Sequence, residues 1–131
     1  MSTSVKSQLI YLLWQSPESR LQTDNLYYAQ LITEQCIQVL EASLTSRSLG
    51  DLKLRFVNLG RVPSDLLARA VSRLQYIDLW FTNLTPEQCI HVVEASISSK
   101  TLVNVDIGGN DRSLEGVPED RLAQAGKILN H

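Results

Sequence analysis

The sequence has little that could support chemistry at a metal or catalytic centre. It contains two histidines, His91 and the last residue His131, and two cysteines, Cys36 and Cys89. Few residues are therefore available to form a nucleophile paired with a histidine base. We expect no enzymatic activity, and no bound metal or cofactor.

Long basic runs and long apolar runs are also missing. Twelve Lys and Arg residues stand against fourteen Asp and Glu, which gives a formal net charge of −2. The basic footprint of proteins that bind nucleic acid or anionic membranes is thus absent. The apolar stretch 9–14 is too short to span a bilayer, and no signal-peptide cleavage site follows it. We expect a cytoplasmic protein with no nucleic-acid or membrane partner.

The chain contains a clear internal repeat within one globular domain. Its 131 residues are 44% apolar, which is enough for a single core. Residues 31–54, "LITEQCIQVLEASLTSRSLGDLKL", match residues 84–107 at an offset of 53, with 11 of 24 positions identical. A divergent unit lies between them and recurs in part from Leu114. The 53-residue block therefore consists of two alternating units.

Each unit begins with a strand-like segment and continues as a helix. The segments open at Leu21, Leu49, Leu74 and Leu102, spaced 28, 25 and 28 residues apart, each with an L-x-x-L-x-L-like pattern. "TPEQ" at 85–88 predicts a helix start, with Thr85 as N-cap and Gln88 in the reciprocal capping position. We expect Pro63 and Pro118 to start helices in the same way.

With this repeat pattern the sequence resembles the leucine-rich repeat family, in the long-repeat class typified by ribonuclease inhibitor. The resemblance covers roughly residues 21–131 and implies an α/β solenoid, with a short curved parallel sheet on the concave side and helices on the convex side. The usual Asn or Cys at the ninth repeat position is present only as Asn110; Ala29, Val57 and Thr82 occupy it elsewhere.

The N-terminal segment fits the same frame. Leu9, Leu12 and Leu21 have the spacing of Ile37, Leu40 and Leu49. Residues 1–20 are therefore interpreted as an N-terminal cap or a half repeat of a single domain that covers residues 1–131. The chain is either a native four-unit stack or a fragment of a larger array.

Aromatic residues are concentrated on one predicted surface. In the repeat, positions three, five, seven and eight look out of the concave sheet. Six of the eight aromatic residues fall among these sixteen positions. From them we predict a partner-binding surface that consists of Tyr27, Tyr28, Arg55, Phe56, Tyr76, Asp78, Trp80 and Phe81. The expected function is binding of a protein or peptide partner, because aromatic residues dominate binding hot spots. The alternative is self-association.

Two further questions stay open on the sequence alone. Position eight could turn inward, which would make Phe56 and Phe81 core residues and Tyr28 semi-buried. The aspartates at 51, 78 and 106 could form a polar rim around the aromatics or a solvated face, with Lys53 and Arg55 partly balancing them. Cys36 and Cys89 are expected to be buried and unpaired, and "GGND" at 108–111 to be a turn after the last strand.

Overall fold

A parallel sheet forms one layer of the molecule. The computed structural model describes residues 23–25, 31–46 and 49–131. Its five strands follow one another across the sheet in chain order, and every neighbouring pair is parallel. The strands are β1 (Thr23–Asn25), β2 (Asp51–Lys53), β3 (Tyr76–Asp78), β4 (Asn104–Asp106) and β5 (Leu129–Asn130).

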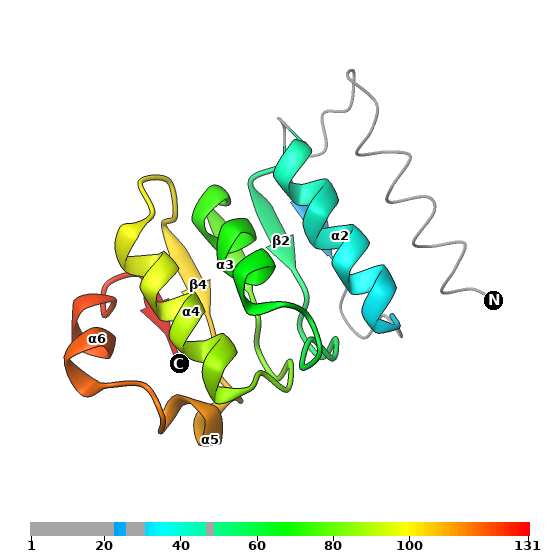
Figure 1. Cartoon of the computed structure of the whole chain (residues 1–131). Helices are drawn as coiled ribbons and strands as arrows, with labels where there is room; N and C mark the ends of the chain where they lie inside the picture. Colours follow the sequence, from blue (N-terminus) through cyan, green and yellow to red (C-terminus); the bar gives the residue numbers. More distant parts are fainter. Residues whose placement is uncertain (1–22, 26–30, 47–48) are drawn as a thin grey trace.

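Helices form the second layer and alternate with the strands along the chain. They are α2 (Thr33–Thr45), α3 (Ser64–Arg73), α4 (Pro86–Ser98), α5 (Asp111–Leu114) and α6 (Glu119–Gln124). Helices α2, α3 and α4 lie side by side over one face of the sheet, and the short α5 and α6 follow beside α4 (Figure 1). The opposite face, which we call the open face, carries no helix of the described residues.

The strand register is the one that the leucine alignment predicts. Leu52, Ile77 and Val105, the fourth residues of successive units, are partners across β2, β3 and β4. All three are buried in a continuous core between the sheet and the helices. The opening leucines Leu49, Leu74 and Leu102 are buried as well. The sequence pattern thus predicted which side of β2, β3 and β4 faces the helices.

The predicted helix start at Thr85 is confirmed. The Thr85 hydroxyl accepts from the Gln88 backbone N–H at 3.1 Å, and the Gln88 side chain accepts from the Thr85 N–H at 2.8 Å. Pro63 and Pro118 differ by one residue from this pattern. They take the N-cap place of Thr85 rather than the first helical place of Pro86, so α3 and α6 begin at Ser64 and Glu119.

The turns after the strands share one backbone geometry despite their varied ninth residues. Residue eight of each described unit has a positive φ: 66° at Phe56, 56° at Phe81 and 76° at Gly109. Asn110 behaves as a turn asparagine. Its Nδ2 donates to the Leu79, Ile107 and Gly108 carbonyls, and its Oδ1 accepts from the Leu84 N–H at 3.1 Å.

The structure also adds a strand that the four-unit division does not contain. Strand β5 pairs with β4 through Val105 and Leu129, so "GGND" is a turn before the last strand rather than after it. Leu129 is buried, but Gly126 stands where an opening leucine would be, which hid this unit in the sequence. The interpretation of residues 1–20 as a cap and the places of Tyr27, Tyr28 and Ala29 lie outside the described residues.

Candidate partner-binding site

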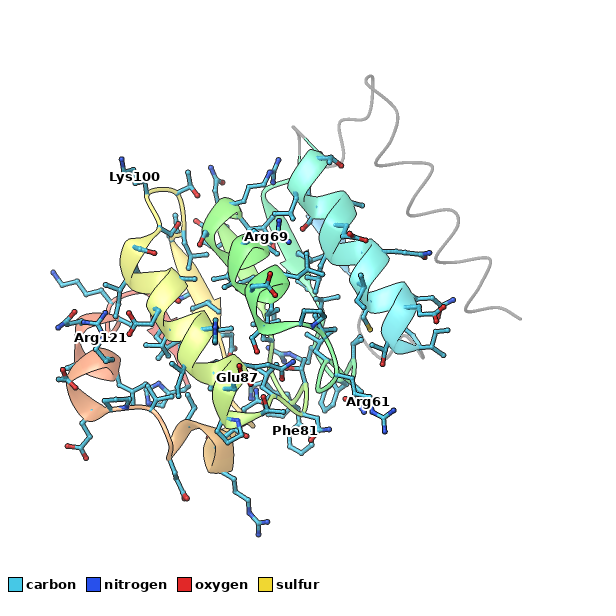
Figure 2. The ribbon with its side chains drawn as sticks, in the orientation of Figure 1. Arg61, Arg69, Phe81, Glu87, Lys100 and Arg121 are labelled. Atoms are coloured by element: carbon cyan, nitrogen blue, oxygen red, sulfur yellow. The ribbon has the colours of Figure 1, made fainter. Side chains whose placement is uncertain are left out.

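The predicted surface residues that the structure describes lie on the open face or at its carboxyl-terminal edge. Tyr76 is 45% exposed and Phe81 is 56% exposed, whereas Arg55, Phe56, Asp78 and Trp80 are half-buried. Figure 2 shows Phe81 at the edge where strands turn toward helices, on the same side of the molecule as Arg61 and Glu87. The structure therefore brings these six predicted residues to one surface.

Three of the aromatic side chains form a contiguous group, which we call the aromatic cluster: Phe56, Trp80 and Phe81. The rings of Phe56 and Trp80 meet edge to face, with centroids 5.0 Å apart. Phe81 completes the triangle at 5.7 Å from Phe56 and 5.4 Å from Trp80. These separations are those of favourable aromatic pairs. Contacts among the three rings thus preorganise the aromatic cluster.

Both glycines of the following unit make room for the cluster. A Cβ on Gly108 would lie 2.6 Å from Cδ1 of Trp80, and a Cβ on Gly109 would lie 2.6 Å from Cδ2 of Phe81. Either contact is far below van der Waals separation. The "GG" pair was interpreted only as a turn, but its absent side chains also allow the two rings to lie against the segment that follows β4.

Charged side chains surround the cluster on the sheet. Arg55 pairs with Asp78, with Nη2 2.9 Å and Nε 3.0 Å from the same Oδ2 atom. Its Nη2 lies 3.7 Å from Oδ2 of Asp106, and its guanidinium carbon lies 5.1 Å from the centroid of Trp80. Arg55 therefore joins the aromatic cluster to two carboxylates, as a cation over a ring and as an ion-pair partner.

The aspartates also shape the backbone at this place. Oδ1 of Asp78 accepts from the Trp80 N–H, and Oδ1 of Asp106 accepts from the Gly108 N–H, both at 3.0 Å. These bonds hold the turn that orients residue seven of each unit. Of the two interpretations of the aspartates, the polar rim agrees with the geometry at Asp78 and Asp106. Asp106 was not among the predicted site residues, although it occupies position five, as Asp78 does.

The alternative that placed Phe56 and Phe81 in the core is not what the structure shows. Neither residue belongs to the buried core, which consists of the helix-facing aliphatic residues. At position eight the chain has left the strand with a positive φ, and Phe56 and Phe81 pack against Trp80 and against each other instead of in the core. Trp80 differs from the expectation of an exposed residue, because its contacts with Phe56, Phe81 and Arg55 leave it half-buried. Tyr27 and Tyr28 lie outside the described residues.

Other reactive side chains are engaged elsewhere. Cys36 and Cys89 are buried and unpaired, as predicted, and burial raises the pKa of each thiol to about 11. His91 Nδ1 lies 2.9 Å from the Glu87 carbonyl oxygen on α4. Within the described ranges, no group of three or more His, Cys, Asp or Glu residues could hold a metal ion. No helix in the same ranges is long and apolar enough to cross a membrane.

Comparison with known proteins gives one informative similarity. No model of a known protein family matches the chain. The chain is 31% identical over 88 residues to NACHT, LRR and PYD domains-containing protein 4C of Mus musculus. The matched segment is 67% of this chain and 8% of the mouse protein, so the chain spans a small part of the length of that relative. The mouse protein is named for leucine-rich repeats, which agrees with the resemblance seen in the sequence.

Proposed function

We propose that the chain is a leucine-rich repeat solenoid that binds a protein or peptide partner on its open face. The contact surface is the aromatic cluster together with Tyr76, Arg55 and Asp78. Tyr27 and Tyr28 were assigned to the same surface from the sequence alone. The proposal includes no catalytic role. It draws support from the repeat register, from the similarity to a leucine-rich repeat protein and from the chemistry of the open face.

The observation that carries the proposal is the placement of Phe81. A bulky side chain at positive φ is a genuine outlier, and such positions cost of order 1–3 kcal/mol. Gly109 occupies the equivalent place in the next unit, where the same φ is free of that cost. Phe81 nevertheless stands there with 56% of its surface exposed, and its ring contacts Phe56 and Trp80 rather than the buried core. The exposed part of this side chain is available to a partner, which supports the proposal.

The size of the surface suits a binding hot spot. Each aromatic side chain has roughly 150–250 Å² that can be buried, so Phe81, Trp80 and Tyr76 together offer a few hundred Å² even when partly covered. The largest apolar patch on a typical monomer is about 300–600 Å² and is often functional. The cluster also needs little ordering on binding, because its rings already contact one another.

Affinity capture with matched variants tests this proposal. Full-length chain, Phe81→Ala and Ile90→Ala are immobilised and exposed to the same cell extract, and retained proteins are quantified by mass spectrometry. Ile90 is an exposed apolar residue on α4, 37% exposed, and it lies on the helical side. We expect a protein retained by the native chain and by Ile90→Ala, and reduced about tenfold or more on Phe81→Ala.

A protein retained equally by all three chains would contradict the proposal. Sedimentation of the native chain over a wide concentration range addresses self-association, the second candidate, which the exposure of Tyr76 and Phe81 also favours. A dimer that dissociates in Phe81→Ala but persists in Ile90→Ala would identify the partner as a second copy.

A further inference from the structure

The carboxylates of Asp78 and Asp106 beside the aromatic cluster indicate which kind of partner the surface can bind. We propose that the partner presents a lysine or arginine beside an apolar side chain, with the cation against Asp106 and the apolar group on Phe81 and Trp80. This inference rests on the proposed function, because it concerns the same surface. Its basis is the charge left over on the open face after the internal ion pair has formed.

Two carboxylates stand side by side on the open face. Asp78 and Asp106 are direct partners in the register of β3 and β4. Neighbouring strands are about 4.8 Å apart, and like charges directly opposite one another are unfavourable. Lys53 on β2 is the register partner of Asp78 on its other side, whereas the partner of Asp106 on β5 is the neutral Asn130. The arrangement therefore favours a further cation at Asp106.

Arg55 lies closer to the carboxylate of Asp78 than to that of Asp106. It contacts Asp78 at hydrogen-bonding distance, but its Nη2 is 3.7 Å from Oδ2 of Asp106, which is too long for a hydrogen bond. Oδ1 of Asp106 accepts from the Gly108 N–H, so Oδ2 keeps most of its capacity to accept hydrogen bonds from a partner. The Asp106 side chain is 23% exposed. Among the described residues, Arg55 is the only cationic group within 4 Å of it.

The chain itself shows how such a surface holds a cation. Arg55 is bound by a carboxylate and at the same time lies over Trp80, 5.1 Å from the ring centroid. A partner's lysine or arginine at Asp106 would find a carboxylate on β4 beside the same aromatic cluster. The aliphatic stem of either residue packs on apolar surface while the charged head stays polar. An acidic partner would instead face the carboxylate of Asp106.

Selection from a phage-displayed random peptide library on the full-length chain tests the inference. We expect the selected peptides to be enriched in Lys or Arg adjacent to Leu, Phe, Trp or Met. Synthetic versions should bind about tenfold more weakly to Asp106→Asn, since a close charge pair is lost. Asn keeps the oxygen that accepts from Gly108, so the turn and the melting temperature should be unchanged.

A double-mutant cycle makes the assignment specific. Replacing the peptide arginine by citrulline, which is neutral, should weaken binding to the native chain but have little further effect on Asp106→Asn. Glu41→Gln removes one negative charge from an exposed position of α2, on the helical side, and should leave affinity unchanged.

The outcomes separate this inference from the proposed function. If peptides depend on Phe81 but bind equally to Asp106→Asn, or tolerate citrulline, the partner is not basic at this place and the inference is overturned alone. If binding is indifferent to Phe81→Ala, or if the selection yields no binding peptide, the proposed function falls as well.

Discussion

At the scale of single residues, position eight links a backbone requirement to the composition of the surface. The turn after each strand needs a left-handed residue, and three units meet that need with Phe56, Phe81 and Gly109. Two of these side chains, Phe56 and Phe81, belong to the aromatic cluster. Gly108 and Gly109 then leave the space in which Trp80 and Phe81 lie. The positive φ at Phe81 and the space left by the two glycines are therefore parts of the same local structure.

This account predicts an unusual order of stability at Phe81. Glycine in place of alanine ordinarily destabilises a protein by about 0.5–1 kcal/mol, but the left-handed region reverses the preference. We therefore expect Phe81→Gly to have a free energy of unfolding about 0.5–1 kcal/mol above that of Phe81→Ala, measured by urea denaturation. Both variants should lose partner binding.

The same pair of substitutions at Glu87 provides the control. Glu87 lies in the first turn of α4 at negative φ, so Glu87→Gly should be less stable than Glu87→Ala. If Phe81→Gly is also the less stable of its pair, the positive φ does not strain the chain and the argument from strain fails.

The sequence predicted which residues lie on the surface but not the conformations that they adopt. Alternation of inward leucines and outward polar or aromatic residues predicted the sides of Leu79, Tyr76 and Asp78, because a strand has a period of two. It could not decide position eight, since the strand ends before that residue and periodicity no longer applies. The half-burial of Trp80 was not predictable for a related reason, because it depends on Arg55 and Gly108, which come from the neighbouring units.

At the scale of elements, Gln88 connects one helix to the preceding unit. It is 2% exposed, and its Nε2 donates to the Leu59 carbonyl at 2.8 Å and to the Val62 carbonyl at 2.7 Å. Its Oε1 accepts from Thr85, so one side chain caps α4 and satisfies two carbonyls of the loop before α3. The capping box was visible in "TPEQ", but the bonds to residues 26 and 29 positions earlier were not.

Substitution of Gln88 should therefore cost more than loss of the cap alone. Gln88→Met leaves two buried carbonyls without this donor, and we expect the free energy of unfolding to fall by about 2 kcal/mol or more. Thr85→Val removes the bond to the Gln88 N–H and should cost about 1 kcal/mol. Denaturant unfolding measures both changes.

Gln35 is the matched control, because it occupies the same place in the sister unit at the offset of 53. It is half-buried, and in the described part of the chain its side chain accepts only from the Ile32 N–H, at 3.0 Å. Gln35→Met should lower stability much less than Gln88→Met. Equal losses at the two positions would mean that the bonds to Leu59 and Val62 contribute nothing.

At the scale of the whole molecule, the strand and helix layers give two different faces. The helical side carries the pairing of Arg121 with Glu94 between α6 and α4, and this contact holds the pKa of the Glu94 carboxyl below its ordinary value. The open face carries the aromatic cluster and the carboxylates of Asp78 and Asp106. Repetition along the chain places the equivalent residues of each unit in rows across the sheet. A partner that lies along such a row contacts several units at once.

The central claim is that a partner contacts the open face at the aromatic cluster, and site-specific photocrosslinking tests it most directly. A photoreactive phenylalanine analogue is incorporated at position 81 in one chain and at position 90 in another, and each is irradiated with the partner recovered by affinity capture. We expect an efficient crosslink from position 81 and none from position 90, with the position-81 product suppressed by excess native chain but not by excess Phe81→Ala. A crosslink from position 90 without one from position 81 would place the partner on the helical side and contradict the account.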